Sequence, residues 1–176
     1  VNISSDARIK VMSLCPDNHE LNLRTSLVPG QGKNYKYRKF AETKPILFHD
    51  LIDILEINRK FYEEGLFAIL SPEVIKKYAF ESIVENVLTK EKIETIILGE
   101  NQTDAVNLFR SAIPKQQEFI YQLLVDKLVA NSDIDLNFID RISRVYCYDQ
   151  DRNKIRSTIL EKAEEIKSYR EMNKKI

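Results

Sequence analysis

The sequence predicts an α+β protein: a small N-terminal β-rich module, either a meander or a partly open barrel, followed by a helical bundle with a projecting C-terminal helix. In the first third of the chain, apolar residues alternate with polar ones, which is the period of a strand. From about residue 80 onward, apolar residues recur three and four positions apart, which is the period of a helix. We therefore expect the β-rich module at 1–80, the bundle at 81–150 and the terminal helix at 151–176.

Short strands account for most of the first module. Residues 9–14 and 21–25 alternate, with a turn between them. A glycine-containing turn then leads into an alternating strand at 35–40, and 46–48 adds a short apolar strand. Residues 66–70 form a continuous apolar strand that we expect to return to the sheet.

Two helices are expected within this module. Asp50 is placed as the N-cap of the first helix, and Gly65 ends it. Ser71 followed by Pro72 is a strong start for the second helix. The apolar face of the first helix is predicted to contain Leu51, Ile54, Leu55 and Phe61.

Four helix starts predict the bundle. Thr89, Thr103, Pro114 and Asp135 are placed at these starts, and Gly99 ends the first of the four helices. Because the apolar residues are mostly three and four positions apart, we expect their faces to pack together. The faces comprise Ile93, Ile96 and Ile97; Val106, Leu108, Phe109 and Ala112; Phe119, Ile120, Leu123, Leu124 and Leu128; and Leu136, Ile139, Ile142 and Val145.

The last segment carries a narrow apolar stripe between charged residues. Such a stripe is thinner than a core-facing helix needs. We interpret the segment either as a projecting helix that contacts a partner or another copy of the chain, or as a frayed tail. The stripe consists of Ile155, Ile159, Ala163, Ile166 and Tyr169.

The composition is that of an ordinary globular protein, with 43% apolar and 31% charged residues among 176. No apolar run approaches the roughly 18 residues of a membrane span, and the polar N-terminus does not resemble a signal peptide. We therefore expect no membrane association. Cys15 and Cys147 lie far apart in the sequence, which favours a reduced, cytoplasmic setting over a disulfide.

The formal net charge is zero, but it is distributed unevenly. Residues 1–48 carry eight Lys/Arg against four Asp/Glu, 49–150 carry eleven against eighteen, and 151–176 carry eight against five. Basic ends around an acidic middle suit contact with an acidic surface or with another copy of the chain. The alternative is that these charges only solvate the surface.

Two ligand-binding motifs are incomplete. Gly30-Gln-Gly32-Lys33 lacks the spacing of a phosphate-binding loop, so a hairpin turn is favoured. Asp133-Ile-Asp135-Leu-Asn137 imitates the start of a calcium loop, but Phe138 and Arg144 stand where that loop needs Gly and Glu. A helix cap at Asp135 explains this segment better.

Catalysis finds little support in the sequence. His49 lies beside Asp50, but no nucleophile with a recognisable motif accompanies the pair, and a surface or capping histidine is favoured. The two histidines and two cysteines lack the spacing of a zinc site. We expect no catalytic residue, no metal and no cofactor, and we expect that the protein is not an enzyme.

A basic and aromatic strand is the strongest candidate for a functional surface. Its tyrosines alternate with its cations, so the tyrosines share one face and the cations the other. The tyrosines either stack on nucleic-acid bases or form a half-buried core, and a protein partner fits as well as nucleic acid does. The candidate surface comprises Lys33, Tyr35, Lys36, Tyr37, Arg38 and Lys39, together with Arg59 and Lys60 from the following helix.

A series of short motifs spans mainly residues 9–80. It consists of Ser13-Leu-Cys-Pro16, Leu23-Arg-Thr25, Gly30-Gln-Gly-Lys33, Tyr37-x-x-Phe40, Glu42-Thr-Lys44, Asp50-Leu51, Asn58-Arg59-x-Phe61, Gly65-Leu-Phe67, Ile69-Leu70 and Val74-Ile75. The series resembles small uncharacterised proteins of tailed bacteriophages, which lie among the virion structural genes. The resemblance implies a head, neck or tail accessory component, located in the virion and assembled in the host cytoplasm. It carries over no catalytic residue.

These observations favour a non-enzymatic structural or assembly protein that binds other proteins, or further copies of itself, in a larger particle. The alternative is a nucleic-acid-binding regulatory protein that uses the basic and aromatic strand at 33–40. The sequence pI of about 6.9 disfavours that alternative, because dedicated nucleic-acid-binding domains are usually strongly basic.

Overall fold

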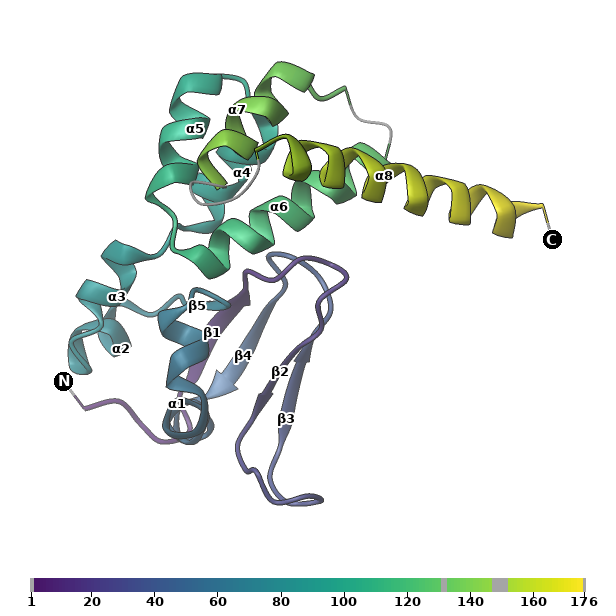
Figure 1. The fold of residues 1–176 in the computed structure, drawn as a ribbon. Helices are drawn as coiled ribbons and strands as arrows, with labels where there is room; N and C mark the ends of the chain where they lie inside the picture. Colours follow the sequence, from purple (N-terminus) through teal and green to yellow (C-terminus); the bar gives the residue numbers. More distant parts are fainter. Residues whose placement is uncertain (1, 131–132, 147–151, 176) are drawn as a thin grey trace. The chain divides into compact units, whose positions relative to one another are not determined.

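The computed structural model describes residues 2–130, 133–146 and 152–175, and for 152–159 it describes the backbone alone. The chain is an α+β protein with its strands in the N-terminal part, as predicted (Figure 1). It forms two compact units, Val1–Lys90 and Glu91–Ile176. The first unit contains β1 (Arg8–Ser13), β2 (Leu21–Arg24), β3 (Asn34–Tyr37), β4 (Thr43–Leu47), α1 (Phe48–Glu63), β5 (Phe67–Ile69), α2 (Pro72–Lys77) and α3 (Glu81–Asn86).

Strand β1 is the centre of a three-stranded antiparallel sheet with the order β4-β1-β5. Ile9 lies opposite Ile46 of β4, and Val11 lies opposite Ile69 of β5. The alternation of β1 buries Ile9, Val11 and Ser13. The return of β5 to the sheet confirms the prediction for residues 66–70, while the strand order differs from a simple meander, in which β1 and β2 would pair.

Strands β2 and β3 form a separate antiparallel hairpin. Leu21 lies opposite Tyr37 and Leu23 lies opposite Tyr35, so these four residues share one face. Leu21, Leu23 and Tyr37 are buried, and Tyr35 is half-buried. This face therefore belongs to the core of the first unit, and the opposite face is polar.

Strand β3 ends at Tyr37, so the prediction of a strand to residue 40 was wrong. The carboxylate of Glu42 accepts the backbone N–H groups of Arg38 (2.7 Å) and Lys39 (3.3 Å), and Asp17 accepts that of Phe40 (2.9 Å). These side chains take the donors that a strand would pair, and they turn the chain toward β4.

Helix α1 packs against strands of both sheets. Leu51, Ile54 and Leu55 are buried on its apolar face, as predicted. The helix is interrupted at Asn58 (φ −129°, ψ 37°), and beyond this kink Tyr62 is buried. Phe61, the predicted core residue, is only half-buried because the kink changes the direction in which the following residues point.

Both ends of α1 are satisfied by backbone groups. At its start, the N–H of Phe48 donates to the carbonyl of Ala7 (2.8 Å), and that of His49 donates to the carbonyl of Ser5 (3.1 Å). Asp50 lies in the first turn and is not the N-cap, which corrects the prediction. At the far end, Gly65 has φ +75°, as predicted for the residue that ends this helix.

A cluster of aromatic rings joins α1 to β5 and to the segment around α2. The ring of Tyr62 lies 5.4 Å from that of Phe67 and 5.1 Å from that of Phe80, measured between centroids. Phe80 also contacts Tyr78, and the guanidinium of Arg59 lies over the Phe80 ring at 5.4 Å. Ring contacts of this kind contribute beyond the area that they bury.

The second unit is a helical bundle, in which α5 packs on α7 and α8 packs on both α6 and α7 (Figure 1). Ala163 of α8 is buried and Tyr169 is exposed, and the C-terminal part of α8 extends beyond the other helices of the unit. The side chains of Ile155 and Ile159 lie outside the described part of the chain. The helices are α4 (Lys90–Leu98), α5 (Gln102–Ser111), α6 (Pro114–Val129), α7 (Leu136–Tyr146) and α8 (Arg152–Lys174).

The helix ends in this unit follow the sequence closely. Gly99 ends α4 with φ +62°, and Asp135 caps α7 by accepting the N–H of Asn137 at 2.8 Å, as predicted. Asn101, not Thr103, caps α5. Leu136, predicted in the apolar face of α7, is 47% exposed because it lies at the first position of the helix, ahead of the buried residues.

We predict that Tyr62→Phe leaves the stability of the protein unchanged or raises it by about 1 kcal/mol. Among the described residues, the buried hydroxyl of Tyr62 has no hydrogen-bond partner, and burial raises its pKa to about 12. Removing the hydroxyl therefore removes an unsatisfied polar group and no hydrogen bond. Urea unfolding followed by circular dichroism measures the difference.

The matched control is Tyr37→Phe. The hydroxyl of Tyr37 is also buried, but it donates to the carbonyl of Val11 at 3.0 Å. The same substitution should lower the unfolding free energy here by about 1 kcal/mol or more, because it leaves the carbonyl without this donor. Equal effects at the two positions would contradict this account.

Candidate protein-docking hairpin

The loop that joins β2 to β3 begins with a tight turn. The N–H of Gln31 donates to the carbonyl of Val28 at 3.1 Å. Pro29 occupies the second position of this turn and Gly30, with φ +77°, the third, which is the arrangement of a type II turn. Proline presets the backbone angle of its position, and glycine adopts positive φ without strain.

The base of the loop is closed by hydrogen bonds between Thr25 and Lys33. The N–H of Thr25 donates to the carbonyl of Lys33 (3.0 Å), and the N–H of Lys33 donates to the hydroxyl of Thr25 (2.8 Å). Gly32, with φ +73°, lies beside this contact, and a Cβ there would stand 2.5 Å from the Thr25 hydroxyl oxygen. The loop therefore needs glycine at this position, and its shape is well defined. This geometry confirms a hairpin turn in place of a phosphate-binding loop.

Two large apolar side chains are exposed at the tip of this loop. Leu27 is 76% exposed and the adjacent Val28 is 52% exposed. Single exposed apolar residues are common on protein surfaces, but two neighbours on a fixed loop, followed by Pro29, form a small apolar patch. We call Leu27 and Val28 the apolar tip, and residues 21–37 the docking hairpin.

One buried carboxylate anchors the docking hairpin to α1. Asp50, whose side chain is 6% exposed, accepts the hydroxyl of Tyr35 (2.5 Å) and the ammonium of Lys33 (3.1 Å) on Oδ2. Its other oxygen, Oδ1, lies 3.2 Å from Nε2 of His49. Three side chains thus surround one carboxylate, and two of them come from the docking hairpin.

The electrostatics of the anchor follow from these contacts. Burial alone would raise the pKa of Asp50, but the hydrogen bonds from Tyr35 and Lys33, with the nearby charges of Lys33 and His49, outweigh it and hold the pKa below its usual value. Burial, together with the hydrogen bond to Asp50, raises the pKa of Tyr35 to about 12. The anchor is therefore an ionised carboxylate with a neutral tyrosine at neutral pH.

His49 is engaged on both sides of its ring. Nδ1 lies 2.9 Å from the carbonyl oxygen of Ser5, and Nε2 faces Asp50. Both neighbours are acceptors, so a ring nitrogen that carries a proton has an acceptor within reach on either side. Both oxygens of Asp50 are occupied, and His49 joins the N-terminal segment at Ser5 to this carboxylate.

The candidate residues predicted from the sequence separate into three places. Lys33 and Tyr35 lie at the anchor. Tyr37 is buried, so the prediction that it belongs to an interaction surface was wrong. Its side chain points into the first unit, where its hydroxyl donates a hydrogen bond to the carbonyl of Val11. Neither tyrosine of β3 is fully exposed, which removes the stacking surface for bases.

The remaining cations of the hairpin region are at the surface. Lys36 forms an ion pair with Glu20 at 2.9 Å, and its side chain is 41% exposed. The side chains of Arg38 and Lys39 follow β3 and are exposed. We call these three cations the basic flank; they lie at and just beyond the end of the docking hairpin that is away from its loop.

Arg59 and Lys60 lie on the last turns of α1, nine and ten residues beyond Asp50. At 1.5 Å per residue, that separation is about 14 Å along the helix. Arg59 pairs with Glu63 (2.9 Å) and Lys60 with Glu64 (3.6 Å). Their place near the aromatic cluster, and not at the anchor, indicates local roles on α1.

The functional features that sequence reasoning missed are Asp50 as the anchor and Leu27 and Val28 as an exposed patch. Leu27 and Val28 come directly before the Pro-Gly pair. That pair marks a turn, so the sequence did indicate that these two residues lie near a loop tip. Asp50 carried no signal for its contact with β3, because fifteen residues separate it from Tyr35.

Within the described ranges, no three side chains of metal-binding type lie together. Of the helices that the structure describes, none combines the length and apolar character needed to cross a bilayer. Comparisons with protein-family models, with curated proteins and with solved structures found no match to the chain.

We predict that Asp50→Asn destabilises the protein by about 2 kcal/mol, because the neutral amide cannot form the charge-assisted bond to Lys33 and offers one acceptor oxygen in place of two. The wild-type protein should also lose this stabilisation in acid. The folded-state pKa of Asp50 lies below the unfolded value, so the contribution is present above about pH 4 and falls as the pH drops through the folded-state pKa. Urea unfolding at a series of pH values measures both effects.

The control is Asp53→Asn, one turn further along α1, where the side chain is exposed. This variant should change the unfolding free energy by less than about 0.5 kcal/mol. An Asp50→Asn variant with a wild-type stability profile between pH 2 and pH 7 would show that the carboxylate is not an anchor.

Proposed function

We propose that this protein is a non-enzymatic structural or assembly protein that binds other proteins in a larger particle, and that the docking hairpin is its binding element. The apolar tip, Leu27 and Val28, carries this proposal. It exposes apolar side chains on a loop whose shape is fixed by Pro29, two glycines and the Thr25–Lys33 hydrogen bonds. Folding of the first unit alone gives no reason for that exposure.

A fixed loop suits docking for an energetic reason. A flexible loop loses conformational freedom when it binds, and this loss weakens the complex. The anchor at Asp50 and the closed base at Thr25 restrict the docking hairpin before any partner arrives. More of the free energy from burying Leu27 and Val28 is then left to stabilise the complex.

The surroundings of the apolar tip indicate the chemistry of the partner. The basic flank, Lys36, Arg38 and Lys39, is exposed at the end of the hairpin away from the tip, because Lys36 lies opposite Asn22 and the other two cations follow it. Protein interfaces commonly combine an apolar centre with a charged rim, and complementary charge speeds and orients association. The partner surface thus offers an apolar depression to the tip and, at a separate place, acidic groups to the basic flank.

The particle itself is inferred from the resemblance of residues 9–80 to small virion proteins of tailed bacteriophages. On that basis we place the protein in a virion, as a head, neck or tail component that is assembled in the host cytoplasm. An assembly role fits a protein whose most distinctive feature is an exposed docking element. The reaction chemistry of an enzyme is not needed to explain any of the contacts described above.

We predict that a tagged chain captures a protein partner, or associates with itself, and that the double variant Leu27→Ser/Val28→Ser weakens this binding at least about tenfold. Pull-down from cells that make the particle, together with size-exclusion chromatography and light scattering, measures both kinds of binding. Leu70→Ser is the matched control, since Leu70 is also exposed, at 44%, in the first unit. A wild-type chain that stays monomeric and captures no protein would contradict the proposal.

A nucleic-acid-binding regulatory protein remains the second candidate, favoured by the basic flank alone. If it is correct, binding to single-stranded or duplex nucleic acid falls with rising salt and is lost in Lys36→Ala/Arg38→Ala/Lys39→Ala. We expect the opposite: weak binding at low salt at most, with no dependence on the apolar tip. Fluorescence anisotropy with labelled oligonucleotides decides between protein docking and nucleic-acid binding. The measurements use roughly 20–200 mM salt, the range in which nucleic-acid binding responds most to salt.

A further inference from the structure

We propose that the projecting end of α8 pairs antiparallel with the same helix of a second copy of the chain. Tyr169 and Met172, which we call the α8 patch, make the apolar part of this contact. The inference goes beyond the proposed function, since it uses a surface of the second unit and leaves the docking hairpin free for a different protein.

The α8 patch is strongly exposed. Met172 is 69% exposed and Tyr169 is 67% exposed, and among the described large apolar residues only Leu27 exceeds them. The two residues are three positions apart in one helix, so their side chains are neighbours on its surface. They therefore form one continuous apolar patch and not two scattered side chains.

The α8 patch faces away from the bundle. Ala163 is buried and marks the side of α8 that packs on α6 and α7. With 3.6 residues per turn, Tyr169 points about 120° and Met172 about 180° around the helix axis from Ala163. Residues 168–175 are all exposed, and this end of α8 extends beyond the other helices of the unit (Figure 1). A second helix can therefore lie along this side of α8.

Packing against a partner would stabilise the end of α8. In proteins, most of the stability of a helix comes from the packing of an apolar face. The exposed residues 168–175 receive no such packing from the part of the chain that the structure describes. An antiparallel partner covers the α8 patch, and contacts between a methionine sulfur and an aromatic ring add to the gain from apolar burial.

The charge along α8 favours a second copy as the partner. Residues 161–166 contain three Glu and one Lys, whereas residues 167–175 contain four Lys/Arg and one Glu. In an antiparallel pair, the acidic part of each helix lies beside the basic part of the other, while a parallel pair brings like charges together. The surface is thus complementary to itself, as a twofold contact between identical chains requires.

One register satisfies both the apolar and the charged groups. When Tyr169 of each copy lies opposite Met172 of the other, Glu165 lies within one residue, about 1.5 Å along the axis, of the level of Lys175 in the other copy. Within its own helix, Glu165 pairs with Lys162 at 3.2 Å, but both side chains are at least half exposed. Such an exposed pair contributes little, so Glu165 is accessible to the second copy.

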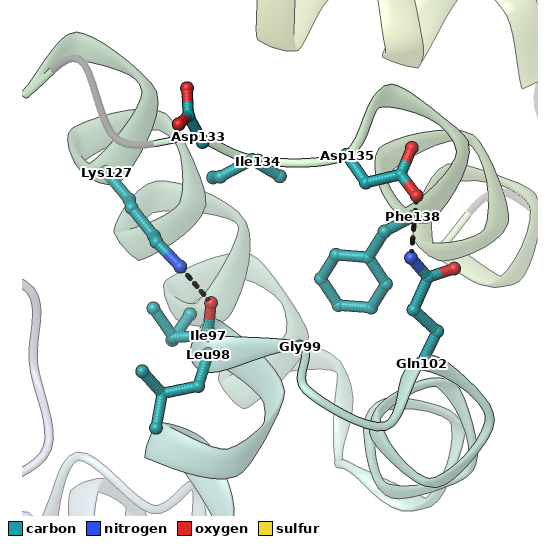
Figure 2. Close-up of a pocket in the computed structure, with 9 residues that line it drawn as sticks. All are labelled: Ile97, Leu98, Gly99, Gln102, Lys127, Asp133, Ile134, Asp135 and Phe138. Atoms are coloured by element: carbon teal, nitrogen blue, oxygen red, sulfur yellow. Dashed lines mark hydrogen bonds between the residues drawn. The ribbon is translucent and has the colours of Figure 1, made fainter.

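The exposed Leu98 at the end of α4 has a different setting. It lines a hollow of about 140 Å³ whose polar groups bind one another (Figure 2). Gln102 donates to the carboxylate of Asp135 at 2.8 Å, and the ammonium of Lys127 donates to the carbonyl of Ile97 at 2.8 Å. The lining comes from residues 97–102, 127 and 133–138 and not from the described part of α8. Leu98 therefore supplies a control outside the α8 patch.

Replacing the α8 patch tests the contact. We expect the light-scattering mass of the wild type to rise from the 20.6 kDa of one chain toward twice that value as the concentration is raised to about 1 mM. Tyr169→Glu/Met172→Glu should fold, since both sites are exposed, and should weaken the association at least about tenfold. The control Leu98→Glu/Leu136→Glu adds the same charges at residues that are 61% and 47% exposed, and it should associate like the wild type.

Charge swaps test the antiparallel direction. Glu165→Lys alone and Lys175→Glu alone each bring like charges together in the pair, so each should weaken the association at least about threefold at low salt. The double variant Glu165→Lys/Lys175→Glu restores opposite charges in an antiparallel pair and should associate more tightly than either single variant. In a parallel pair each position faces its own copy, so the double variant would restore nothing.

The outcomes separate this inference from the proposed function. A wild type that stays at the mass of one chain overturns the inference, as does an association that Tyr169→Glu/Met172→Glu leaves unchanged or a double charge swap that restores nothing. If the wild type is monomeric but captures another protein through Leu27 and Val28, pairing through α8 fails and the proposed function stands. If the pair forms but Leu27 and Val28 capture nothing, the inference stands and the docking role of the hairpin fails.

Discussion

The carboxylate of Asp50 holds the docking hairpin in its place on the first unit. Among the described strands, β2 and β3 form their own sheet, so no ladder of backbone hydrogen bonds joins them to β4-β1-β5. Side chains make the connection instead: Tyr35 and Lys33 bond to Asp50, and Tyr37 bonds to the carbonyl of Val11. The position of the hairpin therefore depends on a few buried polar contacts and on the apolar face between them.

A buried carboxylate is an unfavourable choice unless it is fully satisfied. Asp50 meets this condition with three partners, and its place in the first turn of α1 adds the favourable field of the helix start. The same contact explains why Asp50 does not cap the helix. Its side chain reaches the hairpin, and backbone carbonyls of the N-terminal segment accept the first N–H groups. Backbone groups thus set the start of α1, while Asp50 sets the position of the hairpin.

Local patterns were enough to predict the fold class, most helix ends and the hairpin turn. Gly65, Gly99 and Asp135 act where the sequence placed them, because the requirement for positive φ or for a cap is local. The pairing of β1 with β5, and the burial of Tyr37, depend on contacts between distant residues. For Tyr37 the sequence left open a surface or a core position, and the bond to Val11 settles it. The sequence drew attention to this hairpin, but its faces differ from the expectation: the tyrosines point inward, and the loop tip carries the exposed apolar groups.

A contact made through the apolar tip alone would be small. Two side chains, Leu27 and Val28, bury far less than the roughly 1,200 Å² of a stable interface. Such a contact should be weak between isolated molecules in dilute solution. Inside a particle, neighbouring molecules are held at high effective concentration, where weak contacts become sufficient. A docking element of this size therefore suits a component that stays dispersed while it is dilute and binds when a growing assembly concentrates it.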